Sequence, residues 1–192
     1  RSSRAVKEAM LKAEQELKNE YADEVPKDAE YYVRWNLKIL HSLGIYERDN
    51  QLADEIDKHW FDYMEIRPYA GLSDVLSRLK KRGVKLGIVT NGYQSDIEKL
   101  IPRLELGNVF DILVAADTIG KKKPNPEIFL YTVKKLNVSP AATVFVGDEY
   151  ENDYVGAKKA GLFPILLLAR KKRWQKDLPE GINVIHSLPE LL

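Results

Sequence analysis

Short, predominantly apolar runs recur through the last two thirds of this chain, with helical segments between them. The runs cover residues 84–90, 110–115, 143–147 and 164–168, and a short edge strand is expected over 182–185. They do not alternate apolar with polar residues, as a strand with one solvent-facing side would. Strands covered on both faces are typical of a parallel sheet whose strands are joined by helical crossovers. The pattern therefore predicts an α/β fold.

The first third of the chain has a helical pattern instead. Apolar residues recur there at steps of three and four, which places them on one face of each of three successive helices. These residues are Val6, Met10, Ala13, Leu17 and Tyr21, then Tyr32, Trp35, Ile39 and Leu43, and finally Leu52, Ile56, Trp60 and Met64. Asp49 or Asn50 is expected to cap the third helix. We expect a helical domain over residues 1–66 and an α/β domain over residues 67–192.

Composition excludes several classes of function. The chain has no cysteine, which rules out disulfides, cysteine nucleophiles and zinc-thiolate sites, and its three histidines are far apart in sequence. With 30 basic and 29 acidic residues, the net charge of +1 gives no argument for binding to nucleic acid or to a membrane surface. The one dense basic run, residues 170–173, is interpreted as a solvated loop. No stretch approaches the ~20 apolar residues that cross a bilayer.

The first predicted strand of the α/β domain ends in Thr90, Asn91 and Gly92. In a parallel sheet, ligands bind beyond the carboxyl ends of the strands, so residues that follow a strand are candidates for the site. A hydroxyl and two backbone N–H groups before a helix suit an anion such as phosphate. An ordinary turn that uses Asn-Gly is the alternative.

A lysine-rich loop follows the second predicted strand. Lys123 stands there directly before the proline-stiffened turn formed by residues 124–126. A lysine fixed in this way can hold a point charge against a phosphoryl group, although a solvated basic loop is the alternative. Pro126 suits the first turn of a helix that is expected to reach Leu136.

An acidic run follows the third predicted strand. Asp148, Glu149, Glu151 and Asp153 fall within six positions, and such crowding is costly unless water or a cation compensates the charge. Carboxylate oxygens at a strand end suit Mg²⁺. The alternative is that Asp153 only caps the following helix and that the glutamates are solvated.

The three strand ends together supply an anion-binding turn, a fixed positive charge and carboxylates that could hold a metal ion. Phosphoryl transfer needs these three features. With these features the sequence resembles the haloacid-dehalogenase superfamily. Residues 87–92 are similar to its second motif, residues 123–129 to its third, and residues 146–161 to its fourth. The resemblance covers residues 68–192 and implies a Rossmann-like, doubly wound parallel sheet. Before that point, the helical region resembles the family's inserted cap in position and size only.

The resemblance implies roles for the candidate residues around a phosphate. Thr90, with the backbone of Asn91 and Gly92, would bind the phosphoryl oxygens. Lys123 would neutralise the phosphate and the aspartyl intermediate. The implied substrate is a small phosphorylated metabolite, and neither nucleic acid nor a membrane is an expected partner.

The resemblance also implies a metal and a reaction. Asp148 would be a Mg²⁺ ligand, and Asp153 would support the metal directly or through water. The implied activity is Mg²⁺-dependent hydrolysis of a phosphate monoester through an aspartyl-phosphate intermediate. A cytoplasmic location is the default expectation. The sequence carries no information on the oligomeric state or on which cap residues set specificity.

The sequence departs from the family in one respect. The family's first motif is a strand ending in Asp-x-Asp-x-Thr, with the first aspartate as nucleophile and the second as acid/base, and residues 1–192 contain no such segment. That strand would lie between the strands of the second and fourth motifs, and its lack would expose two buried edges. We therefore expect an apolar strand ending in two aspartates shortly before Arg1 in the full-length protein. Residues 1–192 alone are expected to be inactive.

Two other functions are compatible with the same fold. A haloacid dehalogenase uses no metal, and its fourth motif usually carries a serine where Asp148 stands, so Asp148 favours the phosphatase. A non-catalytic regulatory or binding member of the superfamily is the second alternative. A pure binding module would not need Thr90, Lys123 and Asp148 together, so their presence favours an enzyme.

Overall fold

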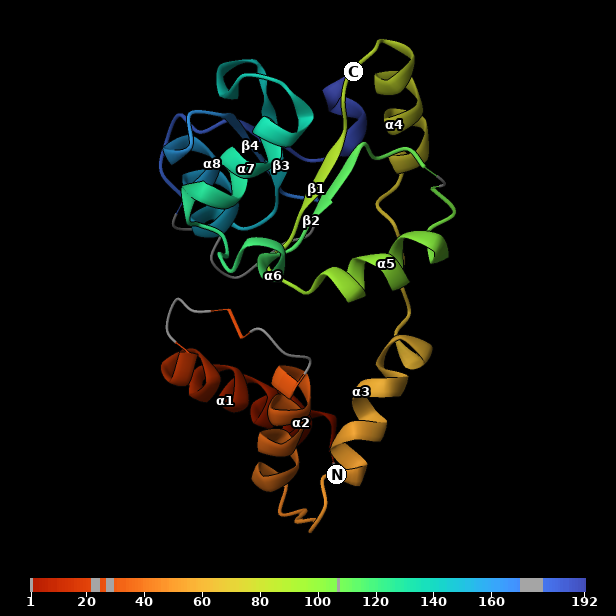
Figure 1. Ribbon diagram of the computed structural model, residues 1–192, viewed down its shortest axis with the longest axis vertical. Helices are drawn as coiled ribbons and strands as arrows, with labels where there is room; N and C mark the ends of the chain where they lie inside the picture. Colours follow the sequence, from red (N-terminus) through yellow and green to blue (C-terminus); the bar gives the residue numbers. More distant parts are fainter. Residues whose placement is uncertain (1, 22–24, 27–29, 107, 170–177) are drawn as a thin grey trace. The chain divides into compact units, whose positions relative to one another are not determined.

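The computed structural model describes residues 2–21, 25–26, 30–106, 108–169 and 178–192, so the basic run 170–173 lies outside the described residues. The chain divides into two compact units, Arg1–Glu65 and Ile66–Leu192. Figure 1 colours the first from red to orange and the second from yellow to blue. Within the described parts of the chain, no helix has both the length and the apolar character that crossing a membrane requires.

The described residues of the first unit form the helices α1 (Ser3–Tyr21), α2 (Glu30–Ser42) and α3 (Gln51–Tyr63). α2 packs against both α1 and α3. Ala13 and Leu17 on the predicted apolar face of α1 are fully buried, which confirms the helical periodicity. On the rim of this packing, Lys38 Nζ of α2 lies 3.2 Å from Glu16 Oε2 and 2.6 Å from Glu20 Oε1 of α1.

The start of α3 differs from the prediction. Asn50 precedes the helix in a left-handed conformation, with φ of 58°, and its side chain makes no capping hydrogen bond. Instead, Glu47 accepts from the N–H of Leu52 at 2.6 Å and from the N–H of Ala53 at 3.1 Å. The prediction of Asp49 or Asn50 as the cap was therefore wrong, because the longer glutamate side chain reaches the first turn from outside the helix.

In the second unit, strands and helices alternate as predicted. They are α4 (Leu72–Lys81), β1 (Gly87–Val89), α5 (Gln94–Arg103), β2 (Ile112–Val114), α6 (Ala116–Ile119), α7 (Pro126–Leu136), β3 (Val144–Gly147), α8 (Gly156–Lys159), β4 (Phe163–Leu167) and β5 (Val184–Ile185). A π-helical turn, Tyr150–Val155, precedes α8. α7 has the predicted bounds, whereas β1, β2, β3 and β5 are shorter than the runs that predicted them.

All the strand pairings are parallel, as predicted, but the described strands form two sheets. β1 pairs with β2, and Ile88 lies opposite Leu113. β4 lies between β3 and β5 in the second sheet, and Val146 lies opposite Ile165. Among the described residues, β1 therefore has a strand partner on one side only, and so does β3.

Helix α7 packs on both β1 and β2 and also on α8, and so holds the core together (Figure 1). The buried core cluster comprises Val114, Ile128, Phe129, Val133, Ala157, Ala160 and Leu162. Phe129 of α7 meets Phe145 of β3 edge to face, with 4.9 Å between the ring centroids. A Cβ added to Gly156 would lie 2.9 Å from Cα of Pro124 and from a ring carbon of Phe129. Gly156 thus allows α8 to approach α7 and the loop before it.

Asp111, just before β2, forms an ion pair with α4 and a hydrogen bond with the backbone just before β1. Lys80 Nζ of α4 lies 2.8 and 2.9 Å from the two carboxylate oxygens, and the N–H of Leu86 donates to Oδ2 at 2.7 Å. The hydrogen bond from Lys80, followed by that from the Leu86 N–H, holds the pKa of the Asp111 carboxyl below its ordinary value of 3.8. The ionised carboxylate is therefore the form that stabilises the fold.

We expect Asp111→Asn to destabilise the protein at neutral pH, and this loss to shrink as the pH falls below 3.8. A depressed folded-state pKa gives stability above the unfolded value, and that stability is lost as the pH falls through the folded-state value. Because the pair is about a third exposed, solvent screening limits the loss to about 0.5–1 kcal/mol. Urea unfolding at pH 7 and in acid measures it, with Asp74→Asn of the exposed Asp74–Arg78 pair as control. An equal loss at both pH values would contradict the assignment.

Candidate functional site

The chain turns at the carboxyl end of β1 through Thr90, Asn91 and Gly92. The N–H of Thr90 still donates to the carbonyl of Val114 in β2, at 3.0 Å. The N–H of Gly92 donates to Thr90 Oγ1 at 3.2 Å. Because the hydroxyl oxygen accepts this bond, the Thr90 O–H proton can be donated to another acceptor, such as an anion.

The side chain of Asn91 joins this turn to the lysine loop. Its Oδ1 accepts from the backbone N–H of Lys123 at 2.6 Å, and its Nδ2 donates to the Lys123 carbonyl at 3.0 Å. A backbone N–H only donates and a carbonyl only accepts, so these two bonds fix the orientation of the amide. The predicted residues of the first two strand ends are thereby brought together.

The ammonium group of Lys123 reaches the third strand end. Lys123 Nζ lies 2.6 Å from Asp153 Oδ1, and the two side chains are only 13% and 6% exposed. The same nitrogen lies 5.6 Å from the centroid of the Phe145 ring, on β3. The expected alternative of a solvated basic loop does not describe Lys123, because its charge is largely withdrawn from water and paired.

Asp153 uses both of its carboxylate oxygens. While Oδ1 meets Lys123, Oδ2 accepts from the N–H groups of Asp148 and Glu149, each at 2.9 Å. Asp153 therefore satisfies the backbone where the chain leaves β3, as a helix-capping residue does, and it carries an ion pair as well. Asp148 lies at the carboxyl end of β3, half-buried.

Gly147 makes room for this carboxylate. A Cβ at this position would lie 2.3 Å from Asp153 Cγ, which is shorter than any real contact. The motif that contains Gly147 predicts no role for this glycine, and the predicted role of Asn91 involves its backbone and not its side chain. A glycine between a buried strand and an acidic run is a signal that identifies such a close approach. The partner of Asn91 is 32 residues away, and no local pattern indicates it.

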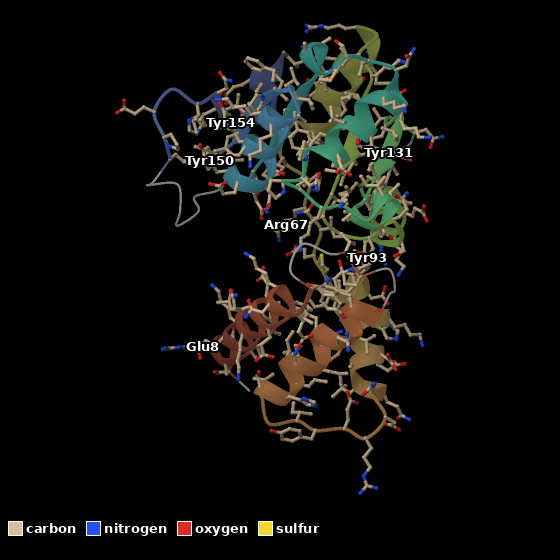
Figure 2. All side chains as sticks on the ribbon, turned by 60° about the vertical axis from the view of Figure 1, so that its left-hand side comes forward. Glu8, Arg67, Tyr93, Tyr131, Tyr150 and Tyr154 are labelled. Atoms are coloured by element: carbon tan, nitrogen blue, oxygen red, sulfur yellow. The ribbon has the colours of Figure 1, made fainter. Side chains whose placement is uncertain are left out.

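Tyr154 holds the π-helical turn that carries Asp153. Its ring is buried and stacks on Tyr150, with 5.7 Å between centroids and 18° between planes (Figure 2). Its hydroxyl accepts from the N–H of Asn183 at 3.2 Å, just before β5. The acidic segment is therefore anchored to the second sheet next to β5.

The described residues contain no group of three or more histidine, cysteine, aspartate or glutamate side chains that could hold a metal ion. Mg²⁺ is commonly held by one or two carboxylates and completes its shell with water and substrate phosphate. Asp148 places a carboxylate at the carboxyl end of β3. Asp153 would have to give up existing bonds to become a direct ligand. The residues present are therefore compatible with a Mg²⁺ ion that is held by one carboxylate at the end of β3.

Comparison with known sequences gives relatives that are phosphatases. The glyceraldehyde 3-phosphate phosphatase of Methanopyrus kandleri is 32% identical over 183 residues, which is 93% of this chain and 77% of that protein. The phosphoglycolate phosphatase 1 of Pseudomonas aeruginosa is 34% identical over 120 residues, 62% of this chain and 44% of that protein. The chain spans between 59% and 66% of three further glyceraldehyde 3-phosphate phosphatases.

Solved structures show the same fold. A 2-haloacid dehalogenase from Pseudomonas syringae pv. tomato superimposes with a TM-score of 0.70 at 26% identity, over 96% of this chain and 78% of that one. The magnesium-bound protein YfnB from Bacillus subtilis gives a TM-score of 0.79 at 23% identity, over 100% of this chain and 82% of that one. These similarities and the parallel strands confirm the predicted α/β, Rossmann-like fold class. A sequence profile of haloacid dehalogenase-like hydrolases matches residues 6–166, and the chain belongs to that family.

Proposed function

We propose that the complete protein is a Mg²⁺-dependent phosphatase that hydrolyses the phosphate monoester of a small metabolite. The observation that carries this proposal is the largely buried ammonium of Lys123, which is paired with Asp153, while Asn91 ties the Lys123 backbone to the turn after β1. A fixed positive charge where several parallel strands end suits a phosphoryl group. The phosphatase names of the relatives support the same reaction class.

In this proposal Thr90 and Lys123 contact the phosphoryl group. The Thr90 hydroxyl donates to one phosphoryl oxygen, together with the backbone N–H of Asn91. The N–H of Gly92 already donates to Thr90 Oγ1, and it therefore orients that hydroxyl rather than contacting the phosphoryl group itself. Lys123 neutralises charge on the oxygens, and its own position is set before substrate arrives because Asp153 already holds it. Such preorganised charge is the main protein contribution to phosphoryl transfer, since the transition state spreads negative charge over three oxygens.

Asp148 is the proposed Mg²⁺ ligand, and Asp153 supports the site through the backbone of Asp148. When bound, the ion supplies positive charge to phosphoryl oxygens beyond that of Lys123. The protein's part is to hold the carboxylates in a fixed place. The N–H groups of Asp148 and Glu149 donate to Asp153 Oδ2 and so hold the Asp153 carboxylate at the end of β3.

We place the nucleophilic aspartate on a strand outside residues 1–192, between β1 and β3, each of which pairs on one side only among the described strands. Its carboxylate oxygen forms a bond to phosphorus as the ester P–O bond breaks, and the alcohol leaves with a proton from an acid. Water then attacks the acyl phosphate, which releases phosphate and regenerates the carboxylate. Residues 1–192 alone would then be inactive, with residues 1–66 as the cap and 67–192 as the core.

The direct test is an assay of the full-length protein on a generic aryl phosphate, with Mg²⁺ and with EDTA. Turnover that requires Mg²⁺ supports the proposal. A folded protein that releases no phosphate in either condition contradicts it. Glyceraldehyde 3-phosphate and phosphoglycolate are the first natural compounds to test, because relatives carry their names.

A 2-haloacid dehalogenase is the second candidate function, and one observation favours it. A dehalogenase of that kind shares the fold at 26% identity. Release of halide from a 2-haloacid without added metal would favour this alternative, whereas Mg²⁺-dependent phosphate release would exclude it as the main activity.

We expect Asp148→Asn in the full-length protein to lower Mg²⁺-dependent turnover by about 100-fold or more, because a neutral amide is a poor ligand for a hard cation. The same variant is expected to lose the rise in melting temperature that Mg²⁺ gives the wild type. Glu151→Gln is the matched control, since Glu151 is exposed in the same acidic run. Equal losses in the two variants would argue against Asp148 as the metal ligand.

A further inference from the structure

We propose that the side chain of Asn91 is a positioning residue that fixes the backbone of Lys123, in addition to any contact of the Asn91 backbone with substrate. This inference rests on the proposed function, because it concerns how that site keeps its lysine in place. Its basis is the pair of hydrogen bonds from one amide to both polar backbone groups of Lys123.

The direction of these bonds separates the proposal from an ordinary Asn-Gly turn. An asparagine that only shapes a turn bonds its own backbone two residues on. The two side-chain bonds described above run instead to a residue 32 positions away, on another loop. Asn91 is exposed, so water competes for both bonds. Two bonds in a fixed geometry nevertheless restrain the Lys123 backbone better than one bond would.

The backbone and the ammonium group of Lys123 are therefore held by residues that follow two different strands. Asn91, after β1, holds its backbone, and Asp153, after β3, holds its ammonium. A lysine side chain is a flexible four-carbon stem, so fixing the ammonium alone leaves the backbone free to shift. Without the amide of Asn91, the Lys123 ammonium would stay paired with Asp153, but the loop that carries Lys123 could shift. The position of the lysine relative to Thr90 and the phosphoryl group would then change.

Asparagine is the side chain that fits this task. Its carbonyl oxygen meets the Lys123 N–H, and its NH₂ group meets the Lys123 carbonyl. Aspartate has no donor for the carbonyl, and serine is too short to span both groups. Alanine removes both bonds while leaving the backbone at residue 91 in place.

The test is a double-mutant cycle in the full-length protein, with Asn91→Ala, Lys123→Met and the double variant. We expect Asn91→Ala to lower kcat about 10- to 100-fold, as misplacement of a catalytic group does. In the Lys123→Met background the same change is expected to alter kcat less than about twofold, because Asn91 acts through the lysine. Equal factors in both backgrounds would overturn the inference.

A control variant and a second measurement make the result decisive. Ser139→Ala removes a capping bond to Ala142 in the same unit and is expected to leave kcat unchanged, although it lowers stability. Asn91→Ser replaces the alanine variant if that variant does not fold.

Binding of inorganic phosphate gives the same cycle where turnover of Lys123→Met is too slow to measure. It is measured by calorimetry in the wild type, the two single variants and the double variant. A wild type without turnover would contradict the proposed function, whereas equal Asn91 effects on phosphate binding would contradict this inference alone.

Discussion

The ion pair between Lys123 and Asp153 is the interaction on which the rest of the site depends. Both charges are largely removed from water, so each needs the other, and Asp153 needs further donors for its second oxygen. Two successive backbone N–H groups at the end of β3 supply them. The pair thus sets the path of the acidic segment and the place of the lysine together. Gly147 is part of the same constraint, because any Cβ there would displace the carboxylate.

The packing of the core positions the two residues of this ion pair. Helix α7 follows the lysine loop directly and places Phe129 against Phe145, the ring above which the ammonium lies. Gly156 lets α8 approach the same loop at Pro124, so the helix after the acidic turn packs against the residues beside Lys123. Because protein interiors are close-packed, a change in one of these contacts shifts the others. The strand ends therefore meet in a defined geometry, although the described strands belong to two sheets.

Much of this arrangement could be predicted from local patterns. The apolar runs indicated parallel strands, Pro126 and Leu136 bounded a helix correctly, and residues after three strands were expected to meet because parallel strands end at one edge. Contacts between distant residues were not predictable in this way. The two hydrogen bonds between the Asn91 side chain and the Lys123 backbone depend on how closely their two loops approach each other. Glu47 caps α3 from outside the helix because the chain bends there. Such features depend on tertiary geometry, which a periodic pattern does not contain.

A crystal structure of the full-length protein with Mg²⁺ and orthovanadate would show whether a phosphoryl group binds at the strand ends that carry Thr90, Lys123 and Asp148. We predict vanadate within hydrogen-bonding distance of Lys123 Nζ and Thr90 Oγ1, and the Mg²⁺ ion on the Asp148 carboxylate. An aspartate from a strand between β1 and β3 should face the vanadium. We also predict that Asn91 and Asp153 keep their bonds to Lys123. Vanadate bound elsewhere, or a Lys123 ammonium turned away from this strand edge, would contradict the account.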